Sequence, residues 1–422
     1  MSFLDCLCVT QTLVETLSSQ DPSDGVSHQY LSSEPAPCST PTKVPAEEKT
    51  IYASDASHYQ LLSELGRGFN NHSLIATARH HPCSRLVAIR LTNLDRCGDE
   101  DVRALQNEVL RTRLFSHPNI LRSHVAFLSS SWLWVVTPLM DFGSAECLLR
   151  TYFPDGMSES LIAYILYGVL QALVYLHGMG FIHRSIKASH ILLSGDGRVC
   201  LTGLRSLCSM MQHGKRSRVV FDIPENSASI LPWLSPEVLR QDLHGYDVKS
   251  DSYSLGITAC ELASGRVPFQ NVHPTLMLLQ KLSGTPFSLL DTTPFPLQGL
   301  RLKASRSGVD SGIGESVAAS SLMRTMTAER PQSPAPKNFS SLFHNLVELC
   351  IQQEPEKRPS ASSLLTHTFF RQAKMQSKET VLDLLQPAIP LSSLPARPRL
   401  PTASAHFISA TSQGRASSPW EF

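Results

Sequence analysis

A few residues have types and spacing that bear on phosphate chemistry. Gly66 and Gly68 flank Arg67 in a turn between apolar segments, and a backbone approaches a phosphate closely where side chains are absent. Arg90 carries a planar guanidinium, which cannot replace a compact lysine ammonium between two phosphates but can pair with a carboxylate in a bidentate way. The hydroxyl of Ser185 accepts a proton poorly near neutral pH, and the imidazole of His190 is a poor magnesium ligand.

The elements that must position these residues begin with a small sheet. Tyr59 to Leu65 and Arg85 to Leu91 predict strands, Asp101 to Phe115 has helical spacing, and Trp132 to Pro138 is β-rich. After Gly143 the chain is mainly helical. A β-rich part before a larger helical part predicts an α+β fold with two lobes.

Composition sets the boundaries of this fold. We place an N-lobe at residues 58–141 and a C-lobe at residues 142–371. Residues 1–57 are polar and Pro-rich without periodicity, which predicts disorder, and residues 303–337 predict a mobile insert. Residues 372–422 are expected to form a flexible tail.

Charge and length exclude several classes of partner. The formal net charge is +1, which gives no electrostatic reason to expect nucleic acid or an anionic membrane as a partner. Ten scattered cysteines show neither a disulfide framework nor paired metal-ligand spacing, so no metal is expected. The N-terminus has no signal-peptide pattern, and no apolar run approaches ~20 residues. We expect a cytoplasmic and nuclear protein.

The landmarks of a protein kinase follow one another in order over Tyr59 to Phe370, and the chain resembles that family with a bilobal fold. The resemblance puts Ser185 in place of the catalytic aspartate, His190 in place of a magnesium-binding asparagine and Gly203 in place of the main magnesium-binding aspartate. It therefore implies a pseudokinase with no catalytic residue, since phosphoryl transfer depends on metal-borne charge stabilisation.

The same resemblance assigns the other site residues. Asn71 replaces the third glycine of the phosphate loop, so no cofactor is required, and ATP binding without magnesium stays open. Residues expected to line a nucleotide site are Leu65, Gly66, Gly68, Asn71, Ser73, Ala88 and Arg90. Structural roles fall to Asp251, which would anchor the catalytic-loop backbone, and to the expected ion pairs of Arg90 with Glu108 and of Glu237 with Arg358.

A closer resemblance is to the sterile-twenty-related adaptor (STRAD) pseudokinases. It is carried by the runs His183 to Leu192, Trp233 to Glu237 and Gln241 to Tyr246, and by the terminal Trp420-Glu421-Phe422. It implies an allosteric activator of the liver kinase B tumour-suppressor kinase, which binds that kinase as a pseudosubstrate. A calcium-binding-protein-39-type helical-repeat scaffold would complete a heterotrimer by binding the terminal aromatic residues.

Several alternatives remain open. The protein could be an atypical, weakly active serine/threonine kinase in which His190 or Asp222 replaces the base, or a passive signalling adaptor. The Arg90–Glu108 pair either locks the small-lobe helix inward or is a weak exposed pair. Ser311 and Ser316 either form a doubly phosphorylated degradation signal or belong to a plain linker.

Overall fold

The computed structural model describes residues 52–68, 72–224, 227–241, 243–283, 338–375 and 378–394. All of them belong to one of the chain's two compact units, Thr50–Phe422. The predictions for Asn71, for residues 303–337 with Ser311 and Ser316, and for Trp420-Glu421-Phe422 lie outside the described residues.

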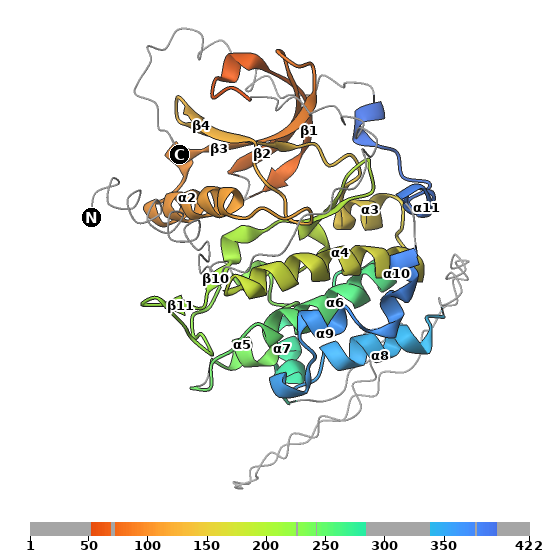
Figure 1. The fold of residues 1–422 in the computed structure, drawn as a ribbon. Helices are drawn as coiled ribbons and strands as arrows, with labels where there is room; N and C mark the ends of the chain where they lie inside the picture. Colours follow the sequence, from red (N-terminus) through yellow and green to blue (C-terminus); the bar gives the residue numbers. More distant parts are fainter. Residues whose placement is uncertain are drawn as a thin grey trace, which may run out of the picture. The chain divides into compact units, whose positions relative to one another are not determined.

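The N-lobe is a five-stranded antiparallel sheet with one long helix against it (Figure 1). The strand order is β1-β2-β3-β5-β4. Leu105 and Val109 of the helix pack with Leu133 and Val135 of the sheet. The elements are β1 (Tyr59–Gly68), β2 (Ser73–His80), β3 (Leu86–Asn93), α2 (Asp99–Leu114), β4 (Val125–Ser129) and β5 (Trp132–Pro138).

The C-lobe is mainly helical and contains the largest core of the described chain. Its helices are α3 (Ala145–Thr151), α4 (Glu159–Gly178), α5 (Pro236–Arg240), α6 (Lys249–Ser264), α7 (Pro274–Ser283), α8 (Ser341–Cys350), α9 (Ala361–Leu364), α10 (Arg371–Met375) and α11 (Lys378–Leu384). Helix α4 is long and apolar enough to cross a membrane, but most of its residues are buried among other helices, as in the core helix of a globular lobe. The predicted α+β bilobal fold is confirmed.

Short strand pairs carry the residues of the cleft between the lobes. The strands are β6 (Gly143–Ser144), β7 (Phe181–Ile182), β8 (Ile191–Leu193), β9 (Val199–Leu201), β10 (Cys208–Ser209), β11 (Met211–Gln212) and β12 (Lys215–Arg216). Strand β8 pairs with both β6 and β9, and β7 pairs with β10. These pairings place the two ends of the catalytic loop beside the segment that follows β9.

Both ends of the fold extend beyond the predicted boundaries. Tyr52 lies within residues 1–57, predicted to be disordered, yet its ring stacks on His124 with centroids 4.1 Å apart. Val381 and Leu385 lie in the predicted flexible tail, yet both are fully buried in the C-lobe core. The boundary at residue 57 was wrong because a single apolar residue in a polar segment gives no periodic signal, and the boundary at residue 372 was wrong because the apolar residues from Val381 to Leu385 have helical spacing over only five residues.

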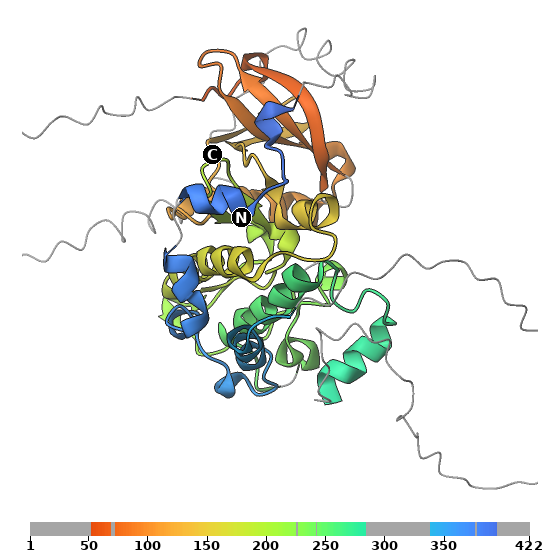
Figure 2. The same cartoon turned by 90° about the vertical axis from the view of Figure 1, so that its right-hand side faces the viewer.

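The C-terminal segment then returns toward the linker between the lobes. The backbone N–H of Leu391 donates to the carbonyl oxygen of Asp141 at 2.7 Å. Asp141 is the last residue of the predicted N-lobe. Figure 2, which looks at this side, shows the blue C-terminal segment rising from α10 past α11 to the level of the sheet.

Candidate functional site: a cleft with replaced polar groups

Ser185 and His190, both in the loop between β7 and β8, meet in the cleft. Their side chains lie 3.1 Å apart between Oγ and Nδ1, and His190 Nδ1 is also 2.8 Å from the Ser185 carbonyl oxygen. Because a carbonyl oxygen only accepts, Nδ1 is the protonated ring nitrogen in that contact. Burial lowers the pKa of His190 to about 3, so the ring stays neutral at physiological pH.

Gly203, which follows β9, is locked against the same ring. Its φ is +85°, and a Cβ added there would lie 2.4 Å from His190 Nδ1. The Thr202 N–H donates to the His190 carbonyl oxygen at 2.9 Å, which fixes this approach. The imidazole therefore occupies the space that a side chain at position 203 would need. The residue types at positions 190 and 203 depend on each other sterically.

On the N-lobe side, Arg90 of β3 and Glu108 of α2 form the predicted ion pair, with Nη1 and Oε1 2.8 Å apart. The alternative of a weak pair exposed to solvent does not fit, since the Glu108 side chain is only 9% accessible. It is joined by one hydrogen bond and not by the bidentate pair that an arginine allows. Arg90 Nε is buried and has no hydrogen-bond partner among the described residues.

Helix α2 is also tied to the segment after β9. Arg111 donates to the carbonyl oxygens of Leu204 and Arg205 at 3.1 and 3.0 Å. Arg205 in turn pairs with Asp101 at 3.0 Å. Together with the Arg90–Glu108 pair, these contacts tie α2 to strand β3 and to the segment after β9.

The residues present fit a nucleotide better than a magnesium ion. Arg90 Nε is a buried donor without a partner among the described residues, and the Lys187 ammonium has a long 3.5 Å bond to the Ser229 carbonyl oxygen and lies 5.4 Å from the centre of the Trp233 ring. A neutral buried imidazole at His190 and no side chain at Gly203 give a hard cation no oxygen ligand. Within the described ranges, no cluster of three or more His, Cys, Asp or Glu is placed to hold a metal.

The other predicted nucleotide residues lie on the N-lobe strands. Gly68 pairs with Ser73 across β1 and β2, and Ala88 lies two residues before Arg90 on β3. The Ser73 hydroxyl is fully buried and bonded to Thr92 Oγ1 at 2.6 Å, so it is not available to a ligand in this arrangement. Leu65 and Gly66 lie on β1 before the turn.

The residues predicted to have structural roles in the C-lobe are Asp251, Glu237 and Arg358, which we call the frame. Their contacts are the expected ones. Asp251 of α6 has no accessible surface and accepts hydrogen bonds at 2.8 Å from the backbone N–H groups of His183 and Arg184 and from His177 Nε2. Burial alone would raise the pKa of Asp251, but these hydrogen bonds hold it below its usual value. Arg358 forms two hydrogen bonds with the Glu237 carboxylate, at 2.5 and 2.8 Å.

Two contacts in the C-lobe were missed from the sequence. Arg184 donates to the Asp222 carboxylate at 2.6 Å, so Asp222 is held in an ion pair and not poised as a base. Lys281 of α7 is fully buried and donates to the Pro232 and Leu234 carbonyl oxygens at 2.6 and 2.7 Å. Only the position of Arg184 within the catalytic-loop motif could have pointed to the first contact, and nothing local points to the second.

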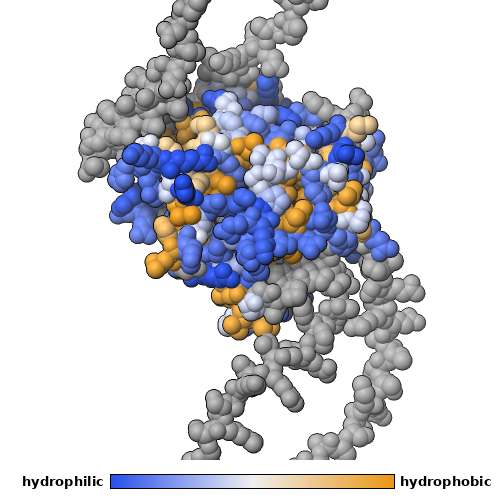
Figure 3. Space-filling model, turned by 60° about the horizontal axis from the view of Figure 1, so that its bottom comes forward, coloured by the Kyte–Doolittle hydropathy of each residue, from blue (hydrophilic) through white to orange (hydrophobic). Residues whose placement is uncertain are grey.

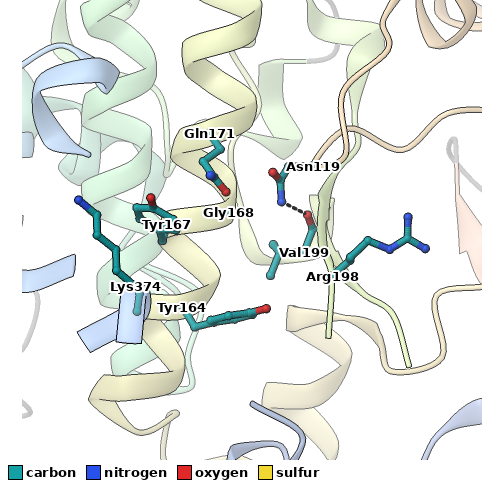
Figure 4. A pocket seen from close by; sticks show the side chains of 9 residues that line it. Asn119, Tyr164, Tyr167, Gly168, Gln171, Arg198, Val199 and Lys374 are labelled. Atoms are coloured by element: carbon teal, nitrogen blue, oxygen red, sulfur yellow. Dashed lines mark hydrogen bonds between the residues drawn. The ribbon is translucent and has the colours of Figure 1, made fainter. Parts of the chain in front are cut away.

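A separate pocket of about 340 Å³ lies along α4 (Figure 4). Tyr164, Tyr167 and Gln171 form one side, and Asn119 and Val199 form the other, joined by the 2.8 Å bond from Asn119 Nδ2 to the Val199 carbonyl oxygen. None of the predicted nucleotide residues lines it. It is therefore distinct from the cleft.

The segment between β10 and α5 presents apolar side chains to solvent. Phe221 and Ile223 are 58% and 44% exposed, and Leu279 of α7 is 58% exposed. On the face shown in Figure 3, apolar patches likewise interrupt a mostly polar surface. Exposed large apolar residues in a group are a feature of interaction surfaces.

The comparisons with known proteins agree with this architecture. Residues 59–370 match the model of the protein kinase domain family. Mouse and human STE20-related kinase adapter protein beta are each 54% identical to the chain, over 96% and 95% of its length and 97% and 96% of their own. The chain belongs to the STE20-related kinase adapter family. Bovine STE20-related kinase adapter protein alpha is 50% identical over 80% of this chain and 91% of its own. The STRAD resemblance drawn from the motifs is thus confirmed.

Proposed function

We propose that this protein is a catalytically inactive pseudokinase that activates a partner kinase allosterically, and that the partner is liver kinase B. The observation that carries the proposal is the contrast at the cleft. Ser185, His190 and Gly203 offer no ionised oxygen to a proton or a cation, while α2 is tied to β3 by the Arg90–Glu108 pair. An adapter fixed in one shape can favour the active state of a kinase if it binds that state more tightly.

The surface that would contact the partner kinase is the one that binds peptide substrates in kinases. Phe221 and Ile223 are exposed apolar side chains of the segment between β10 and α5, and Lys281 braces the loop from Leu231 to Leu234 in the same segment. In this arrangement the protein would engage the partner as a pseudosubstrate. We further propose that Trp420 and Phe422 anchor a calcium-binding-protein-39-type scaffold, that ATP binds without magnesium, and that the complex acts in the cytoplasm and nucleus.

The test is reconstitution of the trimer from purified components at saturating amounts of this protein, with turnover of a peptide substrate as the readout. We expect an increase of at least about tenfold over the partner kinase alone, which is a coupling of about 1.4 kcal/mol. The activity should vanish with a catalytically dead partner and fall when Trp420 and Phe422 are both changed to Ala.

Two controls separate the competing functions. No increase in turnover despite complex formation would make the protein a passive adaptor. Metal-dependent peptide labelling by this protein alone, abolished in a Ser185→Ala and His190→Ala double variant, would make it an atypical kinase. Either result would overturn the proposal.

A further inference from the structure

Arg184 of the catalytic loop contacts the segment after β9 at two points. Its side chain is almost fully buried, and its φ of +65° is a left-handed conformation that non-glycine residues adopt at a cost. Nε donates to the Ser206 carbonyl oxygen at 2.6 Å, and Nη1 donates to Asp222 Oδ2 at 2.6 Å. Arg184 thus joins the beginning of this segment, at Ser206, to its middle part, at Asp222.

Asp222 is the acceptor at the centre of a small polar cluster. The Asp222 Oδ1 atom accepts from the Cys208 thiol at 3.1 Å. The Tyr246 hydroxyl donates to the Asp222 carbonyl oxygen and accepts from Arg184 Nη1. Burial would raise the pKa of Asp222, but the Arg184 guanidinium and the Cys208 thiol hold it below its usual value. The carboxylate is therefore ionised, and both of its oxygens are engaged.

The backbone around Asp222 is held as well. Val220 and Tyr246 exchange two backbone hydrogen bonds, at 2.8 and 2.9 Å. Gly245, with φ +65°, lets the two chains approach, because a Cβ there would lie 2.8 Å from the Val220 carbonyl oxygen. The Asp222 side chain is itself 56% exposed, like its neighbours Phe221 and Ile223, so its carboxylate meets the buried Arg184 guanidinium at the protein surface.

In many kinases a phosphorylated residue in this segment orders it by pairing with an arginine. Here the carboxylate of Asp222 already supplies the negative charge. We propose that Asp222 is a built-in substitute for an activation-segment phosphate, a positioning residue that keeps the segment ordered, with Phe221 and Ile223 exposed, in the unphosphorylated protein. That the ordered segment then receives a partner rests on the proposed function, but the ordering itself does not.

The test uses the full chain, dephosphorylated and checked by intact mass, without any partner. Hydrogen exchange is measured for the amides of Val220 and Tyr246, and trypsin cleavage after Arg216 and Arg218 is timed. Wild type should be protected. Asp222→Asn and Asp222→Ser should exchange and be cleaved about tenfold faster or more, since Asn keeps an acceptor oxygen but loses the negative charge that pairs with Arg184, and Ser loses the charge and the reach of the carboxylate.

Two further variants keep the result interpretable. Asp196→Asn breaks an exposed ion pair with Arg198 of similar length, 2.8 Å, on the β8–β9 turn, and should leave the segment unchanged. Phosphoserine incorporated at position 222 should restore protection in the Asp222→Ser background, which a merely space-filling role would not do. The proposal is overturned if Asp222→Asn exchanges like wild type, or if phosphoserine gives no more protection than serine. Loss of partner activation with normal protection would instead count against the proposed function alone.

Discussion

Asp251 and the Glu237–Arg358 pair lie fully buried in the C-lobe, and each carboxylate there accepts at least two hydrogen bonds. In the cleft above them, Ser185, His190 and Gly203 present a hydroxyl, a neutral ring and no side chain. A buried charge that loses its partner destabilises the fold, whereas a charge at an open cleft is solvated and can be lost without that penalty. The comparison therefore indicates that the charges of the frame hold the fold together, whereas these three cleft residues carry no charge on which the fold could depend.

The largest effect is expected from breaking the frame. Arg358→Met removes a buried guanidinium with 0% accessible side chain and leaves the Glu237 carboxylate unpaired. The free energy of unfolding should fall by about 3–5 kcal/mol, measured by urea denaturation. Arg67→Met, which breaks the exposed pair with Glu64, is the matched control and should cost less than about 1 kcal/mol. Equal losses would remove the contrast between frame and surface.

A carboxylate introduced at position 203 of the cleft should also destabilise the folded protein. Gly203→Asp places a Cβ at positive φ and 2.4 Å from His190 Nδ1, which should cost about 2–4 kcal/mol. Gly214→Asp is the control, because Gly214 has φ +73° with nothing within 4 Å and so reports the backbone cost alone.

Changing His190→Asn in the Gly203→Asp background makes room for the carboxylate. The double variant should recover about 1–2 kcal/mol relative to the sum of the single changes, measured by the same denaturation. Strict additivity would show that the ring and the glycine are independent.

The boundary between frame and cleft can be probed by pH at Glu261 of α6. Its carboxylate accepts from the Ala188 N–H and from Trp233 Nε1, and burial raises its pKa from 4.5 to about 7. Between these values the folded state keeps a proton that the unfolded chain has released, so the contribution of Glu261 to stability falls as the pH rises through this window.

Glu261→Gln keeps an acceptor oxygen and removes the charge. The difference in unfolding free energy between variant and wild type should shift in favour of the variant by roughly 2–3 kcal/mol between pH 4.5 and 8. The difference is measured because histidines with lowered pKa, His124 and His190 among them, act in the opposite direction in both proteins. A difference that does not change with pH would contradict the assignment.

The smallest effect on stability should come from Arg90. Arg90→Ala leaves the mostly buried Glu108 carboxylate unpaired, but Arg90 itself is 25% accessible and water can take its place, so the unfolding free energy should fall by about 1–2 kcal/mol. If α2 is locked by this pair, the same change should greatly reduce activation of the partner kinase in the reconstituted complex, and Arg90→Lys should retain part of it. Full activation by a folded Arg90→Ala protein would show that the pair is not the lock.

The sequence by itself determined the fold class and most of the site. Kinase motifs occur in fixed order, and each carries its residue type, so the serine at position 185, the glycine at position 203 and the frame contacts of Asp251 and Arg358 could be read directly. The pairing of Arg90 with Glu108 followed from the same order.

Only the tertiary structure decided how these parts fit together. His190 fills the space beside Gly203, Asp222 pairs with Arg184, and Val381 and Leu385 complete the C-lobe core. Each of these contacts joins segments that are separated along the sequence. Local patterns carry periodicity and residue chemistry, but not the distance between two side chains that the fold brings together. Steric exclusion and ion pairing depend on that distance, so they appear only once the chain is folded.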